Sequence, residues 1–555
     1  MNFSKKILSQ TVTQLCLAKG IDHIVISPGS RNAPLTIGFS ENPNFNNFSI
    51  VDERCAAFFA LGIAQQIKKP VALVCTSGSA LLNYYPAIAE AFYSDIPLVV
   101  LSADRPEHLI DVGDGQTIRQ ENVFANHILY SASCKEGEGM QEVNEAEINK
   151  ALNMAILQHG PVHINIPFSE PLYETVPALS VTPNPIDAVM EPTKWDSAAY
   201  AEFLTEWNTS QRKMIVVGVL PPNSVEQKYI DVLAQDESVI VLTETTSNLH
   251  HENFFPAIDQ LIAPLGRTEF EALKPDLLLS FGGMVVSKKI KAFLRSYKPQ
   301  MHYHIDIKKA FDTYFVLKAH FRTDINSFLK LLVSDIESIK SNYRNYWLNV
   351  KNQRLEAHER YVNMIPFSDF KVFSEIFKRL PENIQLQLAN SATVRYAQLF
   401  ELHPSFSVFC NRGTSGIDGS TSTAIGAAYP SRVPTVFLTG DLSFFYDSNA
   451  LWNDFIRKDF RIIIVNNSGG GIFRILPGNN ESENFTTFFE TRHTLTAEYL
   501  SLMFGFEYRS AKDEKSLILA LKDFFDESHQ PKVLEVFTPP EENDKVLLDY
   551  FDFIS

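Results

Sequence analysis

The fold of this chain is decided by the stretch TVFLTGDLSFF (residues 435–445). Its run of apolar and β-branched residues predicts a buried strand, which ends at Gly440 and Asp441 before a second apolar run begins. In open α/β sheets, ligands bind beyond the carboxyl ends of the strands. Asp441 is therefore a candidate ligand-binding residue, and capping of the following helix is the alternative.

Strand-like runs of the same kind recur along the whole chain. The first third contains DHIVIS, FSIV, VALVCT, PLVVLS and VHINI; the second contains MIVVGVLPP, SVIVLTE, DLLLSFGG and HYHIDI; the last contains NIQLQLAN, FSVFC, TVFLTGD, RIIIVNN and KVLEVF. Most of the runs in the first third are followed by a turn and a helix-like segment, which is typical of parallel sheets with crossover helices. A proline-marked passage (170–193) and a charged helical passage (about 334–362) indicate connections between units.

We therefore predict an α/β protein with three doubly wound parallel-sheet domains, at residues 1–175, 190–345 and 365–555. The chain length of 555 residues is too great for a single hydrophobic core and favours about three domains. The apolar fraction of 45% is that of an ordinary globular enzyme.

Charge and cysteine content argue against several classes of partner. The chain has 65 acidic and 49 basic residues, so its formal charge of -16 repels phosphate backbones and we expect no nucleic-acid partner. No apolar run approaches the roughly 18 residues that span a bilayer, so we expect no stable membrane insertion and a cytoplasmic location. The five cysteines form no CxxC pair, which argues against a zinc site.

A second polar strand end follows the apolar run RIIIV. It consists of Asn466 and Asn467, and then Ser468 and Gly469. A hard divalent cation prefers oxygen ligands, and a carboxylate, an amide oxygen and a backbone carbonyl at neighbouring strand ends would supply them. The alternative is that Asp441 caps a helix and Asn467 shapes a turn.

Taken together, Gly440-Asp441 and Asn466-Asn467 resemble the signature of thiamine diphosphate-dependent decarboxylases and carboligases. This resemblance implies the thiamine diphosphate-binding fold, with Mg²⁺ or Mn²⁺ bound by Asp441, Asn467 and the carbonyl of Gly469. It also implies a glutamate in the first domain that hydrogen-bonds the aminopyrimidine ring of the cofactor. Glu53, in FSIVDERCAAFFALG, is the matching residue. The chain departs from the family at Leu442, where many relatives have glycine.

Longer motifs narrow the resemblance. SPGSRNAPL, SADRPEHL, NRGTSGIDG and GDLSFFYD are similar to those of the 2-succinyl-5-enolpyruvyl-6-hydroxy-3-cyclohexene-1-carboxylate (SEPHCHC) synthases of menaquinone biosynthesis, transferases that match the whole chain. The resemblance implies decarboxylation of 2-oxoglutarate and conjugate addition of the resulting succinyl carbanion equivalent to isochorismate, giving SEPHCHC and CO₂. Both substrates are dicarboxylates, and arginine is suited to bind them because it holds a carboxylate through two parallel hydrogen bonds.

Site residues are carried over from the family by motif. Glu53 is the expected catalytic residue. The expected cofactor-binding residues are Glu53, Asn390, Ser391, Ile417, Asp441, Leu442, Ser443, Asn467, Ile472 and Phe473. The expected substrate-binding residues are Ser30, Arg31, Arg105, Gln116, Lys288, Ser391, Arg395, Arg412, Ile472 and Phe473. Two of these have open alternatives: Arg105 as a structural residue, and Lys288, with Lys289, as part of a solvated helix face.

Two other functions stay open at this point. The chain could be another thiamine diphosphate-dependent 2-oxo acid carboligase or decarboxylase, similar to acetolactate synthase, or a catalytically silent cofactor-binding regulator on the same fold. The arginine set argues against a small pocket for pyruvate alone, and the presence of Glu53 beside Asp441 and Asn467 argues against a silent binder. The family's active site lies between two subunits, so the resemblance also implies a homo-oligomer, either a dimer or a tetramer.

Overall fold

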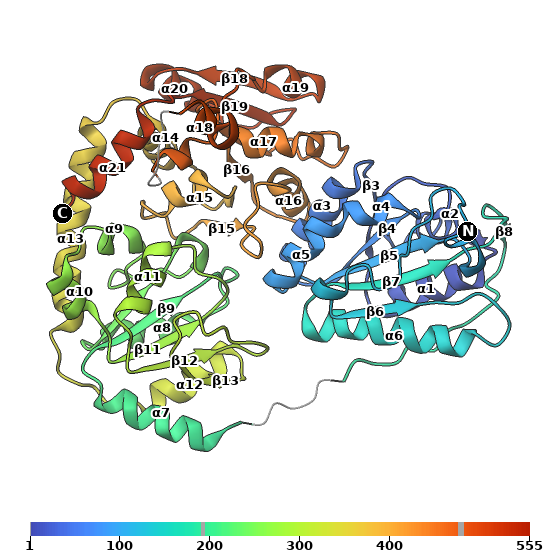
Figure 1. The fold of residues 1–555 in the computed structure, drawn as a ribbon, viewed down its shortest axis with the longest axis horizontal. Coiled ribbons are helices and arrows are strands. Elements are labelled where there is room, and N and C mark those ends of the chain that lie inside the picture. The colour runs from blue at the N-terminus through green and yellow to red at the C-terminus, as the bar shows by residue number, and fades with distance from the viewer. Residues whose placement is uncertain (1, 190–194, 476–481) are drawn as a thin grey trace.

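The computed structural model describes residues 2–189, 195–475 and 482–555. These residues form three parallel β-sheets flanked by helices, as the strand pattern predicts (Figure 1). The fold class is therefore confirmed. The limits of the three domains stay predictions.

The N-terminal sheet has six parallel strands in the order β3-β2-β4-β5-β7-β6. Its strands are β2 (His23–Ile26), β3 (Asn46–Ser49), β4 (Val71–Cys75), β5 (Leu98–Asp104), β6 (Tyr130–Ser133) and β7 (Val162–Pro167). Its helices are α1 (Ile7–Ala18), α2 (Ala33–Ser40), α3 (Glu53–Ile67), α4 (Ser79–Asn83), α5 (Tyr85–Ser94) and α6 (Gln141–Gln158). A short antiparallel pair, β1 (Phe3–Ser4) and β8 (Thr175–Val176), ties the start of the chain to the end of this unit.

The middle sheet has five parallel strands in the order β10-β9-β11-β12-β13. Its strands are β9 (Lys213–Val217), β10 (Val239–Leu242), β11 (Leu277–Phe281), β12 (Met301–Ile305) and β13 (Leu317–Phe321). Its helices are α7 (Ser197–Thr209), α8 (Gln227–Gln235), α9 (Ile258–Ile262), α10 (Arg267–Leu273), α11 (Lys288–Ser296) and α12 (Ile325–Asp335). The helix α13 (Tyr343–Met364) then leads to the last unit and buries Trp347 and Tyr361, so the predicted charged connection also has a packed face.

The C-terminal sheet has six parallel strands in the order β15-β14-β16-β17-β19-β18. Its strands are β14 (Gln385–Leu388), β15 (Ser407–Cys410), β16 (Thr435–Gly440), β17 (Arg461–Asn466), β18 (Glu507–Ala511) and β19 (Lys532–Phe537). Its helices are α14 (Asp369–Phe377), α15 (Ala392–Ala397), α16 (Ser420–Ala428), α17 (Asp441–Tyr446), α18 (Glu483–Phe485), α19 (Glu498–Met503), α20 (Glu514–Leu521) and α21 (Asn543–Phe553).

The two six-stranded sheets share one topology. Counted from the first strand of each unit, both have the order 2-1-3-4-6-5, and the middle sheet has the order 2-1-3-4-5. The strand order therefore reverses between the first and third strands of each unit, which are β14 and β16 in the C-terminal sheet. Ligands of such sheets bind at this reversal point. Asn390 and Ser391 follow β14 and Asp441 follows β16, so the fold places three predicted site residues there.

Besides the short pair β1 and β8, the sequence pattern missed one strand of each of the three parallel sheets, and each of these lies at an edge. These strands are β6, β13 and β18. Most of their residues are only partly buried, so they lack the continuous apolar run that marks an inner parallel strand. The half-exposed edge strand β3 was nevertheless predicted, because the chain continues from it into the apolar residues Ile50 and Val51.

Helices α3 and α16 join the N-terminal and C-terminal units (Figure 1). They cross at two glycines: a Cβ on Gly62 would lie 2.1 Å from the Thr423 carbonyl oxygen, and one on Gly426 would lie 2.0 Å from that of Phe59. One hydrophobic core runs across this crossing, and Phe58 and Phe59 are almost fully buried in it. Burial of each such side chain contributes about 1.5–3 kcal/mol. These two helices occupy the same place in the two topologies, each following the second strand of its unit.

Candidate functional site

Asp441 lies where the sequence predicts, at the end of β16 and at the start of α17. Its side chain is only 3% exposed. Oδ1 accepts a hydrogen bond from the Leu442 amide at 2.7 Å, and Oδ2 accepts one from the Gly469 amide at 3.0 Å. Nε2 of His493 lies 3.3 Å from Oδ2. The carboxylate is thus buried, and neighbouring N–H groups fix its orientation at the strand end.

Asn467 faces the same region from the end of β17. Its Nδ2 donates a hydrogen bond to Oδ2 of Asp369 at 2.8 Å, which sets the orientation of the amide. Its Oδ1 is buried and, within the described ranges, has no hydrogen-bond partner. Burial raises the pKa of Asp369 to about 6, and its hydrogen bonds to Thr538 and Asn467 act in the opposite direction. A buried oxygen without a donor requires an explanation, and a bound cation would provide one.

The third oxygen of this set is the backbone carbonyl of Gly469, two residues after Asn467. Gly469 has a φ of 148°, which L-residues rarely adopt, and a Cβ there would lie 2.5 Å from the carbonyl oxygen of Glu490. The chain can therefore turn this tightly beside Asp441 only at a glycine. The Asp441 carboxylate, the unpartnered Asn467 oxygen and the backbone at Gly469 fit a hard divalent cation. No group of three or more His, Cys, Asp or Glu side chains that could hold a metal occurs in the described part of the chain.

Asn390 and Ser443 organise the loops around this strand end. Nδ2 of Asn390 donates to the carbonyl oxygens of Asn411 and Gly416, both at 2.7 Å. Oγ of Ser443 donates to the carbonyl oxygen of Ile417 at 2.7 Å and so ties that residue to α17. Ser391 adopts a φ of 67°, in the left-handed region that non-glycine residues seldom occupy. The predicted cofactor residues Asn390, Ser391, Ile417, Leu442 and Ser443 therefore lie in one connected region.

Glu53 is the first residue of α3. Its Oε2 accepts a hydrogen bond from Nδ2 of Asn83 at 3.0 Å. Asp52 caps the helix, because its carboxylate accepts from the Cys55 amide at 3.2 Å. Further along α3, the Phe58 ring packs against Gly419, where a Cβ would lie 2.1 Å from the ring. The helix that begins at Glu53 therefore packs directly against the loop that carries Ile417, within one chain.

Arg395 and Arg412 lie near each other at the boundary with the middle unit. Burial lowers the pKa of Arg395, and the nearby charge of Arg412 lowers it further. Nη1 of Arg412 donates to Oδ1 of Asn390 at 2.6 Å. Nε of Arg412 is buried, and no described residue accepts a hydrogen bond from it. Two cations held this close in a protein favour an anionic ligand between them.

The middle unit contributes two buried acids that the sequence reading missed. Glu244 accepts hydrogen bonds from the amides of Val286 and Ser287, both at 2.7 Å. Burial raises the pKa of Glu244 to about 7, and the positive charge of Arg412 acts in the opposite direction. Burial also raises the pKa of Asp259, against the influence of its hydrogen bond to Ser287 and of nearby cations that include Arg395.

The loop held by these acids leads into α11, which begins with the predicted substrate residue Lys288 and its neighbour Lys289. Both lysines are exposed. Burial lowers the pKa of Lys291, and nearby cations that include Lys288 lower it further. Lys289 points its ammonium group over the ring of Phe551, 4.9 Å from the centroid. Lys289 therefore packs against the C-terminal helix α21. The role of Lys288 as a substrate residue stays a prediction.

Four predicted substrate residues belong to the N-terminal unit. Arg31 is 4% exposed; its Nη1 donates to the Phe168 carbonyl oxygen at 2.7 Å, and its Nη2 lies 3.1 Å from a carboxylate oxygen of Glu170. Arg105 donates from Nη2 to the Gly115 carbonyl oxygen at 3.1 Å, which supports the loop of Gln116. Ser30 and Gln116 are exposed. Across the described residues, no hydrogen bond or ion pair links these four residues to Arg395 or Arg412.

Ile472 and Phe473 lie on a 3₁₀ turn, Gly471–Ile475, that follows the glycine loop. Phe473 is 37% exposed and packs against Phe489, with ring centroids 6.2 Å apart. Arg474, on the same turn, makes two contacts with the carboxylate of Glu490 at 2.6 and 2.9 Å. The Glu490 carbonyl oxygen accepts from the Gly470 amide at 2.6 Å. Glu490 thus links this turn to the loop beside Asp441.

Residues that sequence reasoning missed share one property: their role depends on distant partners. His493 faces Asp441, and Asp369 orients Asn467. His493 follows no strand or motif, and Asp369, after Ser368, has the pattern of an ordinary helix start. A local signal for either residue is absent from the sequence.

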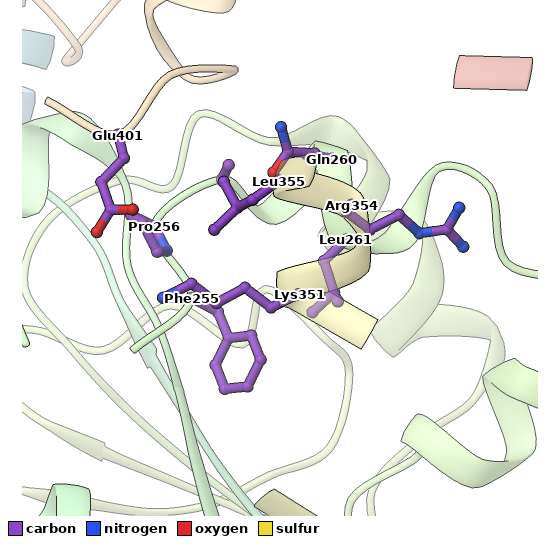
Figure 2. Close-up of a pocket in the computed structure, with 9 residues that line it drawn as sticks. Phe255, Pro256, Gln260, Leu261, Lys351, Arg354, Leu355 and Glu401 are labelled. Atoms are coloured by element: carbon purple, nitrogen blue, oxygen red, sulfur yellow. The ribbon is translucent and has the colours of Figure 1, made fainter. Parts of the chain in front are cut away.

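A small pocket elsewhere in the molecule lies apart from the predicted site residues. It lies between the middle unit and α13, is lined by residues that include Phe255, Gln260, Arg354 and Glu401, and has a volume of about 10 Å³ (Figure 2). That volume holds at most one water molecule. None of the predicted site residues lines it.

Comparison with protein families gives three consecutive matches. Residues 7–128 match the thiamine pyrophosphate enzyme N-terminal TPP binding domain, residues 189–388 the middle domain of thiamine pyrophosphate enzymes, and residues 390–536 the C-terminal TPP binding domain. In the described part of the chain, no helix has the length and apolar character needed to cross a membrane.

Three full-length relatives share one name, 2-succinyl-5-enolpyruvyl-6-hydroxy-3-cyclohexene-1-carboxylate synthase. The protein of that name from Flavobacterium psychrophilum is 56% identical over 551 residues, with 99% of each chain covered. The one from Christiangramia forsetii is also 56% identical, with 100% of each chain covered. The one from Flavobacterium johnsoniae is 54% identical, with 99% of each chain covered.

Proposed function

Because this chain belongs to the SEPHCHC synthase family of thiamine diphosphate-dependent enzymes, we propose that it decarboxylates 2-oxoglutarate and adds the resulting succinyl unit to isochorismate. The products are SEPHCHC and CO₂, and the reaction belongs to menaquinone biosynthesis. One observation of the structure carries the proposal: the buried Asp441 carboxylate lies beside the Asn467 region, where an amide oxygen has no donor among the described residues.

Thiamine diphosphate, when bound, would supply a thiazolium carbon that acts as nucleophile and then as electron sink. Asp441, Asn467 and the Gly469 carbonyl are the residues we assign to the divalent cation, Mg²⁺ or Mn²⁺, that holds the diphosphate. The remaining cofactor contacts are assigned to Asn390, Ser391, Ile417, Leu442, Ser443, Ile472 and Phe473. Support for this assignment comes from the connected hydrogen bonds of Asn390 and Ser443, which fix the loops around the strand end.

Glu53 is the residue we assign to proton exchange with the aminopyrimidine ring. Its Oε2 is oriented by Asn83, while Oε1 accepts no hydrogen bond from the residues that the structure describes. A carboxylate with one oxygen fixed and the other available can share a proton with a ring nitrogen. The packing of α3 against the loop of Ile417 supports the role, because it brings the helix of Glu53 to the C-terminal unit.

The arginines are assigned to the substrate carboxylates. The formal charge of the chain is -16, so a dicarboxylate needs cations gathered at the site itself. Arg395 and Arg412 form one pair, and Nε of Arg412 and Nε of Arg31 are both buried without an acceptor among the described residues. Each Nε can donate a hydrogen bond to a carboxylate oxygen, which together with a terminal nitrogen gives a two-pronged contact. Ser30, Arg105, Gln116 and Lys288 complete the proposed substrate set.

A homo-oligomer and a cytoplasmic location belong to the same proposal. Residues 177–189, which follow the N-terminal unit, contain no helix or strand, so the N-terminal unit of a partner subunit could take the same place on α16. Exchange of identical units between subunits is a common route to a dimer. We propose that the site is shared in this way between two subunits.

The direct test is release of CO₂ by the purified protein with thiamine diphosphate and Mg²⁺. We expect release from 2-oxoglutarate that accelerates on addition of isochorismate. Release from pyruvate instead would favour an enzyme similar to acetolactate synthase, and absence of release from either 2-oxo acid would favour a silent binder. Either of these two results contradicts the proposal.

A further inference from the structure

Glu90, on α5 of the N-terminal unit, is a buried carboxylate with no part in the site described so far. Its side chain is 1% exposed. Oε1 accepts hydrogen bonds from the Gly413 amide at 2.7 Å and from Oγ of Ser94 at 2.8 Å. Oε2 accepts from the Thr414 amide at 2.6 Å and from the Thr414 hydroxyl at 2.8 Å. Both oxygens are therefore fully satisfied, three of the four bonds by the loop that follows Arg412.

The charge of Glu90 is nevertheless not neutralised by an adjacent cation. Among the described residues, no Lys, Arg or His side chain lies within 4.0 Å of its carboxylate, and its donors are neutral groups. Burial of an unpaired carboxylate is expensive unless several hydrogen bonds compensate for it. An uncharged residue would fill the same space at lower cost, so the geometry points to a requirement for an acceptor with two oxygens at this position.

The loop at Gly413 packs closely against α5. A Cβ on Gly413 would lie 2.5 Å from the Glu90 carbonyl oxygen and 2.8 Å from Oγ of Ser94. The backbone of the loop therefore lies directly on the helix, and only glycine permits this approach. The loop is held from its other side by Asn390, which donates to the carbonyl oxygens of Asn411 and Gly416. Glu90 and Asn390 together fix the backbone on both sides of Arg412.

We propose that Glu90 is a positioning residue for Arg412: it holds the backbone of Gly413 and Thr414 so that the guanidinium group faces the substrate carboxylate. Asn390 orients one end of the guanidinium group through Nη1, and Glu90 fixes the main chain from which the side chain projects. This inference rests on the proposed function, in which Arg412 binds a substrate carboxylate. It assigns to the N-terminal unit a role in substrate affinity that does not require contact with substrate.

The test is the variant Glu90→Gln, measured by steady-state kinetics for both substrates. An amide has only one acceptor oxygen, so one of the two loop amides loses its partner. We expect the KM of one dicarboxylate substrate to rise by about tenfold while kcat falls by less than about threefold, since loss of one such bond is equivalent to roughly that factor. Glu356→Gln is the matched control, because it removes the same charge from an exposed position on α13, and its kinetics should equal those of wild type.

A double variant separates positioning from general structural damage. If Glu90 acts through Arg412, Glu90→Gln should add little to the defect of Arg412→Lys, because the group that it positions is already replaced. An equal KM increase in both backgrounds, or an unchanged KM in Glu90→Gln alone, overturns the inference. Failure of the proposed function looks different, since wild type would then have no activity or Arg412→Lys would have no effect on KM.

Thr414 provides a second test if Glu90→Gln does not fold. Thr414→Val removes only the hydroxyl bond to Glu90, and Thr414→Ser keeps it. We expect the KM to rise by about threefold in the valine variant and to stay at the wild-type value in the serine variant, which is the scale of one neutral hydrogen bond. Equal KM values in the two variants would contradict the role of Glu90.

Discussion

At the residue scale, the site combines a small number of buried polar groups whose partners come from distant parts of the chain. Asp441 is fixed by the amides of Leu442 and Gly469, and Asn467 is oriented by Asp369. The unpartnered oxygen of Asn467 is the group that most needs a ligand. These contacts hold the residues of the two-strand sequence signature in the arrangement that the proposed cation site requires.

The role of Glu53 gives the first prediction at this scale. Glu53→Gln should lower kcat by at least about 100-fold, because an amide cannot exchange the proton that a carboxylate shares with a ring nitrogen. The affinity for thiamine diphosphate with Mg²⁺, measured by isothermal titration calorimetry, should stay within a few-fold of wild type, since the proposed cation ligands are untouched. Near-normal turnover in this variant would remove Glu53 from the mechanism.

Glu244 gives a prediction about pH. Its pKa in the folded protein is raised from 4.5 to about 7, so the folded state binds a proton more tightly than the unfolded state does. The contribution of this group to the free energy of unfolding is therefore most favourable below about pH 4.5 and is lost as the pH rises through about 7. Asp259, Lys291 and Arg412 are the charged groups that act on it.

Glu244→Gln removes this titration. The difference in free energy of unfolding between the variant and wild type, from urea denaturation, should shift in favour of the variant by up to about 3 kcal/mol between pH 5 and pH 8. Glu356→Gln, which changes an exposed glutamate, should show no such shift. A difference that is constant across this pH range would contradict the raised pKa.

At the scale of single residues, some parts of the proposed site could be predicted from the sequence and others could not. Asp441 and Asn467 were candidates because they follow apolar strands whose ends meet in a parallel sheet, and the resemblance to a family then selected them, with Gly469, as the expected cation ligands. His493 and Glu90 could not be predicted, because nothing in their neighbouring residues indicates which distant group they contact. Glu53 and the arginines depended on resemblance to a family, since a glutamate at a helix start is ordinarily only a favourable partner for the helix dipole.

At the element scale, the packing of α3 on α16 is the contact that joins the N-terminal and C-terminal units. The sequence does not predict that α3 and α16 cross. Gly62 and Gly426 look like ordinary helix positions, and only the close approach of the two backbones reveals why glycine is required there. The edge strands β6, β13 and β18 were missed for a related reason. Their partly exposed residues carry no strong pattern, and only the neighbouring strand defines them.

Gly426→Ala tests this crossing. A Cβ there would lie 2.0 Å from the Phe59 carbonyl oxygen, so the helices must separate and the variant should lose about 3 kcal/mol in free energy of unfolding. Catalytic activity should fall as well, because α3 carries Glu53. The matched control is Gly266→Ala, where the added Cβ first meets an atom at 3.6 Å and the loss should stay below about 1 kcal/mol. Equal losses in the two variants would show that the close approach is unimportant.

At the scale of the whole molecule, three sheets of related topology each carry residues of the proposed site or residues that act on it. The N-terminal unit supplies Glu53 and Glu90, the C-terminal unit supplies Asp441 and Asn467, and the middle unit supplies Glu244 beside Arg412. The three-sheet architecture was predictable from the strand pattern. The shared strand order was not, because order depends on which strands pair and not on their individual sequences.

Sharing of the site between subunits can be tested with hybrid molecules. Chains carrying Glu53→Gln and chains carrying Asp441→Ala, each with a different affinity tag, are co-expressed and purified through both tags. If the first unit of one subunit completes the site on the third unit of its partner, each hybrid dimer has one intact site and about half of the wild-type activity. No recovery above either parent variant would mean that each site is completed within one chain.

The central claim is the identity of the reaction, and mass spectrometry of the product tests it most directly. The purified protein is incubated with uniformly ¹³C-labelled 2-oxoglutarate, unlabelled isochorismate, thiamine diphosphate and Mg²⁺. The account predicts labelled CO₂ and SEPHCHC labelled only in its succinyl part, with neither formed when the cofactor is omitted. Labelled CO₂ without any labelled adduct of isochorismate would contradict it.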